Sequence, residues 1–146
     1  MLTFIGYFLA TPFTMVGFFL LAYYQPTSVE WRDGCIEVVS SRSLIGGKWV
    51  GAQTFGFMIV YRDAEQQGRG DLAVHERVHV RQAMIGSVLF PIAYGAEFAY
   101  HYVAGPHHVR GDWVKAYYEI SFERKAYARA LGYSLGIDQE SYWGHR

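Results

Sequence analysis

Three residues close together in the sequence, His75, Glu76 and His79, have the types and spacing needed for metal-dependent hydrolysis. They form an H-E-x-x-H pattern. Residues four positions apart in a helix project from one face, so both imidazoles can bind one metal ion. Glu76 lies beside that face, where its carboxylate can take a proton from a water molecule activated by the metal. The pattern predicts a zinc site with Glu76 as general base; the alternative is two surface histidines on an ordinary amphipathic helix.

A catalytic zinc site needs a third protein ligand, with the fourth position left open for water. Three later glutamates are candidates. Glu119 and Glu123 belong to a strongly helical stretch and share one of its faces. Glu97 shares a helix face with His101 inside an apolar segment, where a carboxylate needs a partner. The residues alone leave all three open as the third ligand.

Other polar residues are candidates for supporting roles. Gln82 lies one turn beyond His79, where it either holds the ligand helix by hydrogen bonding or faces solvent. Attack on a carbonyl also needs a hydrogen-bond donor for the oxyanion. The candidates for that donor, by residue type only, are Tyr117, Tyr118, Tyr127, His107 and His108.

Two longer patterns are present: H-E-R-V-H-V-R-Q at 75–82 and F-E-R-K-A at 122–126. With them the chain resembles a family of small metallopeptidases of the gluzincin type, which carry H-E-x-x-H-x-x-Q and a later F-E-x-x-A. The resemblance implies peptide-bond hydrolysis with Glu123 as the third zinc ligand.

This resemblance covers roughly residues 54–132 and is looser in its second half. Family members often carry a proline before the phenylalanine and a second glutamate before the alanine. This chain has Ser121 and Lys125 at those positions.

The first part of the chain predicts a membrane anchor. Residues 1–29 contain no charged side chain, and 2–24 form an apolar run long enough to cross a bilayer as a helix. Pro26 is well placed to stop that helix. A secretory signal peptide would have a basic start, which this segment lacks. We therefore predict a transmembrane helix within an anchor of residues 1–28, with a buried core helix as the alternative.

The distribution of basic residues predicts on which side of the membrane the domain lies. Seven lie between Glu30 and Gln82 and none precede the apolar run. By the positive-inside rule, the protein is predicted to be single-pass with its catalytic domain in the cytoplasm.

Residues 29–146 are predicted to form one zincin-like metallopeptidase domain. Strands at 29–32 and 35–39 would pair around Asp33-Gly34, a dipeptide that suits a tight hairpin turn. A third strand is expected at 54–61, directly before a helix from about 72 to 85. Asp71 is expected to cap that helix.

The second apolar segment, 84–103, is predicted to be a buried or interfacial helix pair. Gly86, Pro91 and Glu97 make it a poor lipid-exposed crossing. The predicted fold class is α+β: a short antiparallel sheet, an active helix at its edge, and further helices that close the site.

Composition limits the partners. Thirteen basic and thirteen acidic residues cancel and no basic run occurs, so nucleic acid is not an expected partner. Cys35 is the single cysteine, which excludes a disulfide framework and a multi-cysteine zinc ribbon. Aromatic residues make up 18%, a share that favours contact with lipid or with a large apolar surface. The expected partners are a peptide or protein substrate and membrane lipid.

Two other functions compete with the peptidase. One is a non-enzymatic membrane or assembly protein whose metal site is structural or degenerate. The other is a binding module with an aromatic docking surface, in which the histidine pattern is accidental.

Overall fold

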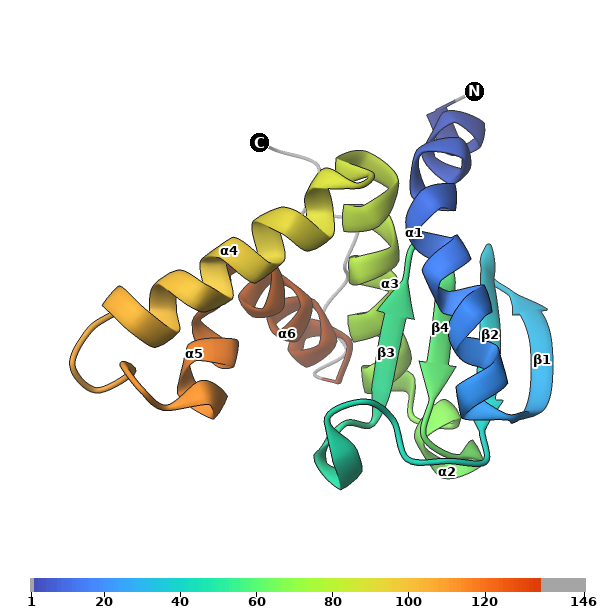
Figure 1. Cartoon of the computed structure of the whole chain (residues 1–146). Coiled ribbons are helices and arrows are strands. Elements are labelled where there is room, and N and C mark those ends of the chain that lie inside the picture. Colours follow the sequence, from blue (N-terminus) through green and yellow to red (C-terminus); the bar gives the residue numbers. More distant parts are fainter. Residues whose placement is uncertain (1, 135–146) are drawn as a thin grey trace.

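The computed structural model describes residues 2–134 and has a mixed α+β architecture (Figure 1). Its helices are α1 (Leu2–Tyr24), α2 (Ala64–Gln67), α3 (Gly70–Gly86), α4 (Leu89–Ala104), α5 (Trp113–Glu119) and α6 (Ser121–Ser134). Its strands are β1 (Pro26–Arg32), β2 (Cys35–Ser40), β3 (Ala52–Phe55) and β4 (Met58–Tyr61), with a short 3-10 helix at Gly47–Trp49. The last part of the predicted domain, 135–146, lies outside the described residues.

The four strands form one sheet in the order β1-β2-β4-β3. β1 and β2 pair antiparallel around Asp33 and Gly34, whose φ angles are 49° and 80°. Positive φ at both central residues is what a tight two-residue hairpin turn requires. The hairpin predicted at this dipeptide is confirmed.

The predicted third strand, 54–61, is wrong as a single element. It is a hairpin of β3 and β4 that reverses at Gly56, where φ is 62°. A side chain at Gly56 would place its Cβ 2.6 Å from the Ala10 carbonyl oxygen of α1, so this close approach requires glycine. This turn could not be predicted from the sequence, because apolar residues lie on both sides of it.

The sheet is mixed, which corrects the predicted antiparallel sheet. β2 and β4 run parallel, with Val38 opposite Val60. β4 lies between β2 and β3, and all four of its residues are buried. An unbroken apolar run such as Met58–Tyr61 is typical of a strand covered on both faces.

A helix covers each face of the sheet. Tyr24 of α1 packs on one face with Val38, Met58 and Val60. Val80 of α3 packs on the other face in a second cluster, whose further members include Cys35, Ile59 and Tyr61. The two sets follow the alternation of side chains along a strand. The helix that carries the histidines is therefore anchored on the sheet.

Helices α4, α5 and α6 form a lobe beside α3 (Figure 1). α4 leaves α3 at a bend of 115°, so the segment 84–103 is a corner between two helices and not a straight crossing. Phe90 is the buried residue of α4. α6 then returns to pack against α3, which brings two distant parts of the sequence together.

Two predictions about helix ends are wrong. α3 begins at Gly70 with Arg69 at the cap position, and the Asp71 carboxylate instead pairs with Arg69 at 2.8 Å. The helical stretch predicted to carry both Glu119 and Glu123 is not one helix, because Ile120 has an extended ψ of 127° and separates α5 from α6. Ile120 is fully buried, and its burial fixes the break.

α1 confirms the predicted N-terminal helix and its bounds. Among residues 2–134 it is the one helix that is by itself long and apolar enough to cross a membrane. It ends before Gln25, whose φ of 48° breaks the helix, and Pro26 begins β1.

Candidate metal centre

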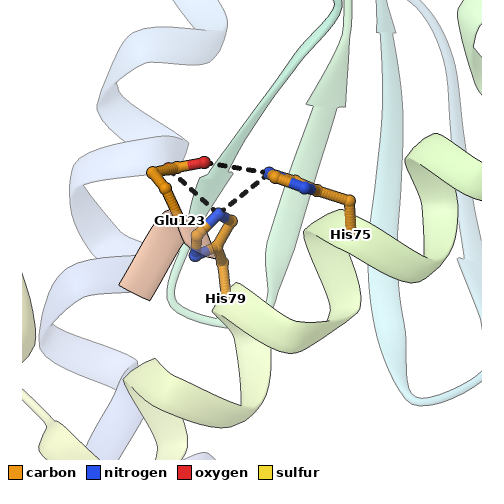
Figure 2. A group of neighbouring side chains, drawn as sticks. All are labelled: His75, His79 and Glu123. Carbon is orange, nitrogen blue, oxygen red and sulfur yellow. Dashed lines mark hydrogen bonds and ion pairs between the residues drawn. The ribbon is translucent and has the colours of Figure 1, made fainter. Parts of the chain in front are cut away.

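α3 and α6 bring three potential metal ligands together (Figure 2). His75 and His79 project from one face of α3, with their Nε2 atoms 3.1 Å apart. Glu123, in the first turn of α6, points its carboxylate between them. Its Oε2 lies 3.2 Å from His75 Nε2, and its Oε1 lies 3.2 Å from His79 Nε2. All three residues are buried.

The spacing of these atoms fits a small divalent cation. Zinc binds imidazole nitrogen and carboxylate oxygen at about 2.0–2.1 Å in tetrahedral geometry, which places neighbouring ligand atoms about 3.3 Å apart. The observed separations are 3.1–3.2 Å. Glu123 Oε2 is also buried and accepts no hydrogen bond from any residue of 2–134. The cluster could therefore hold a metal ion.

The charges of the cluster also suit a cation. Burial by itself raises the pKa of Glu123, but its contacts with His75 and His79 outweigh burial and hold that pKa far below the ordinary value. Burial lowers the pKa of His79, and Glu123 raises it to a net value above the ordinary one. The carboxylate is thus ionised, and any metal must compete with a proton for His79.

Gln82 fixes the orientation of His79. Its Oε1 accepts a hydrogen bond from His79 Nδ1 at 2.8 Å, and its Nε2 donates to the Phe122 carbonyl oxygen at 3.2 Å. Because an amide oxygen only accepts, we assign the His79 proton to Nδ1, which leaves the Nε2 lone pair facing the cluster. Of the two roles considered for Gln82, the hydrogen-bonding one is observed.

Replacing Gln82 by alanine is expected to lower zinc affinity by about 10- to 100-fold, because His79 loses the partner that sets its tautomer and ring orientation. Competition titration against a chromophoric chelator measures this. Gln67→Ala is a matched control, since that amide contacts Glu37 instead of the cluster. Equal affinity in the Gln82 variant and the parent would contradict the assigned role.

Glu76 lies on the same helix but is not one of the three clustered ligands. It is buried, and its Oε2 accepts a hydrogen bond from Thr54 Oγ1 at 2.7 Å. Thr54 belongs to β3, so this bond joins the strand to α3. The role of Thr54 could not be predicted from the sequence, because it depends on β3 packing beside α3.

A tyrosine that was not among the sequence candidates touches the cluster. Tyr94 of α4 donates a hydrogen bond from its hydroxyl to Glu123 Oε1 at 2.6 Å. Burial and the charge of Glu123 raise the pKa of both Tyr94 and Tyr117, so both hydroxyls stay protonated. Tyr94 lies three residues before Glu97, so the two residues share a face of the helix. This spacing from a candidate ligand is the sequence feature that could have identified Tyr94.

Tyr127, another candidate donor, lies beside the cluster, with its ring centroid 4.4 Å from that of His75. The remaining candidate residues lie elsewhere. Glu97 accepts hydrogen bonds from the backbone N–H and the hydroxyl of Ser121 at 2.6 and 2.7 Å, and so caps α6. Glu119 is paired with Arg124 at 3.8 Å. His107 and His108 are exposed in the turn after α4, and Tyr118 is half exposed. Of the three candidate glutamates, the structure brings only Glu123 to the histidines.

Comparisons of the chain with protein-family models, curated proteins and solved structures found no match.

Proposed function

We propose that this protein is a membrane-attached zinc metallopeptidase that hydrolyses peptide bonds. The observation that carries the proposal is the buried cluster of His75, His79 and Glu123, whose atoms are spaced for one small cation. Glu76 follows the first ligand on the same helix, as the hydrolytic H-E-x-x-H pattern requires. The family resemblance, with its F-E-x-x-A pattern around Glu123, supports the same ligand set.

The proposed chemistry divides between the ion and the protein. Zinc held by the three ligands would lower the pKa of a water molecule and polarise the substrate carbonyl. Glu76 takes the water proton and delivers it to the leaving amine. Its bond from Thr54 holds one carboxylate oxygen in place, and the other oxygen would make that transfer.

The tyrosines of the lobe support the cluster. The Tyr94 hydroxyl holds Glu123 in the orientation that faces the histidines. Tyr117 remains a neutral donor beside Glu123 and is our candidate for stabilising the oxyanion.

The proposed substrate is an extended peptide or protein segment. β3 is an edge strand of the described sheet, and the Thr54–Glu76 bond places it beside the proposed base. An edge strand offers unpaired backbone groups to an added strand, which would align a scissile bond along α3.

The proposed location is a membrane. α1 meets the length and hydropathy requirements for the crossing predicted from the sequence. The basic residues after it favour a body on the cytoplasmic side.

One observation favours a second candidate. The three ligands are only 4%, 6% and 2% exposed, and a closed cluster suits a structural metal in a non-enzymatic membrane or assembly protein.

Chelation of the detergent-solubilised protein decides between the two candidates. We expect cleavage of an internally quenched peptide library to stop after chelation and to return when zinc is restored. Magnesium is the matched control, because it prefers six oxygen ligands and should restore nothing. Stoichiometric zinc without any cleavage would contradict the peptidase and favour the structural site.

A further inference from the structure

α1 is bound to the body at intervals from Tyr7 to Tyr24. Near its start, the Tyr7 hydroxyl donates to the Gly34 carbonyl oxygen at 2.7 Å. In its middle, the Phe57 backbone N–H donates to Thr14 Oγ1 at 3.0 Å. At its end, the Tyr24 hydroxyl donates to Gln53 Oε1 at 2.7 Å. No long section of the helix is left free of the body.

The sheet depends on this contact. Val38, Met58 and Val60 are fully buried on the face that α1 covers. If α1 moved away into a bilayer, this apolar face would be exposed to water, at a cost of about 25 cal/mol for each Å² uncovered. α1 therefore completes the core of the domain.

The opposite side of α1 is apolar and exposed. Phe4, Phe8 and Phe19 are 81%, 74% and 77% exposed, and Met15 is 44% exposed. Residues 1–29 contain no charge. The exposed face of a helix packed on a water-soluble body is normally polar, so this one is unusual.

Further exposed apolar side chains lie at the corner between α3 and α4. Ile85, Leu89 and Ile92 are each at least 65% exposed. The corner adjoins α1, because the Ser87 hydroxyl donates to the Leu9 carbonyl oxygen at 2.7 Å. We call the exposed side of α1 together with these three corner residues the outer surface.

A crossing by α1 in this packed position would bring the sheet into the hydrocarbon. The helix is about 34 Å long, close to the thickness of a bilayer core. β1 is an edge strand of the described sheet, and its Glu30 and Arg32 side chains are each 48% exposed. Open strand edges and charges are excluded from lipid.

We propose that α1 lies lengthwise in the surface of a lipid bilayer, with the outer surface turned to lipid, and does not cross it. This inference rests on the membrane attachment in the proposed function and replaces the crossing predicted from the sequence. Phenylalanine-rich faces of interfacial helices enter the boundary between headgroups and acyl chains. Arg81, one turn before Ile85, is exposed and has no ion-pair partner within residues 2–134, which suits an anionic headgroup.

Depth-dependent fluorescence quenching tests the proposal on the full chain. In a Cys35→Ser background, an environment-sensitive probe is attached to Phe4→Cys, Met15→Cys or Ala22→Cys. These positions lie along one side of α1, and all three are exposed, so the changes spare the core. Glu30→Cys is the matched control outside lipid.

We expect equal quenching of the three α1 probes by shallow lipid quenchers, at about 5–10 Å below the headgroups, and none at position 30. A deep signal at position 15 with shallow signals at 4 and 22 would mean a crossing and would overturn the proposal. An absence of quenching with every vesicle would also overturn the proposal. Light scattering would then show whether a second copy of the chain covers the outer surface. Zinc content and cleavage in detergent test the peptidase separately.

The same vesicles test the headgroup contact. Arg81→Gln is expected to weaken binding about fivefold when phosphatidylserine is present, and to change nothing with phosphatidylcholine alone. Equal binding of the variant and the parent to both vesicles would overturn this contact.

Discussion

Replacing Glu76 by glutamine is expected to lower peptide cleavage by about 100- to 10,000-fold, the range that a general base contributes. Glutamine preserves the shape of the side chain and can still accept the Thr54 hydrogen bond, but it cannot take a proton. Zinc should remain bound, because Glu76 is not among the three clustered ligands. Steady-state cleavage and elemental analysis of the same preparation measure both effects.

Glu119→Gln is the control for the Glu76 variant. Glu119 is at the end of α5 and pairs with Arg124, away from the cluster. Its replacement should leave cleavage unchanged. If Glu76→Gln kept activity within a few fold of the parent, another group would have to be the base.

Replacing Glu37 by alanine is expected to lower the free energy of unfolding by about 1.5–3 kcal/mol, the value of hydrogen bonds made by a charged group. Arg77 keeps Asp33 as a partner at 2.8 Å, so its charge is not left unpaired. The Glu37 side chain is 1% exposed on β2, and its Oε1 lies 3.0 Å from an Arg77 nitrogen of α3. Its Oε2 accepts a hydrogen bond from Gln67 at 3.1 Å. The pair joins the sheet to the helix that carries the histidines, and chemical denaturation measures its loss.

Glu30 provides the matched control for Glu37. It stands opposite Glu37 in the β1–β2 register, but its side chain is 48% exposed and pairs with Arg32 at the surface. Glu30→Ala should cost about 0–1 kcal/mol. Glu37→Gln, which removes the charge but can still accept one of the two hydrogen bonds, should fold if the alanine variant does not. Equal stability of the Glu37 and Glu30 alanine variants would show that burial does not increase the contribution of the Glu37–Arg77 pair to stability.

Local patterns predicted the elements that carry the ligands. The spacing of His75 and His79 placed them on one helix face, and Asp33-Gly34 fixed the first hairpin, because both features depend on neighbouring residues alone. Glu123 could be chosen among three glutamates only through the family resemblance. The structure brings it to the histidines because α6 packs against α3, and this distant contact has no local signal.

The predictions that were wrong or missing have related causes. The turn at Gly56 lies within an apolar run, and the helix break at Ile120 depends on burial and on the Glu97 cap, so neither is visible in local propensity. The parallel pairing of β2 and β4 joins strands separated by a long connection. Thr54 and Tyr94 acquire their roles only when β3 and α4 pack beside the cluster.

Metal content of the purified protein tests the ligand set most directly. We predict about one zinc ion per chain in the parent and in Glu119→Ala, and loss of most of it in His79→Ala and in Glu123→Ala. Zinc retained in full without Glu123, or no zinc in the parent after metal-replete purification without chelators, would contradict the proposed centre.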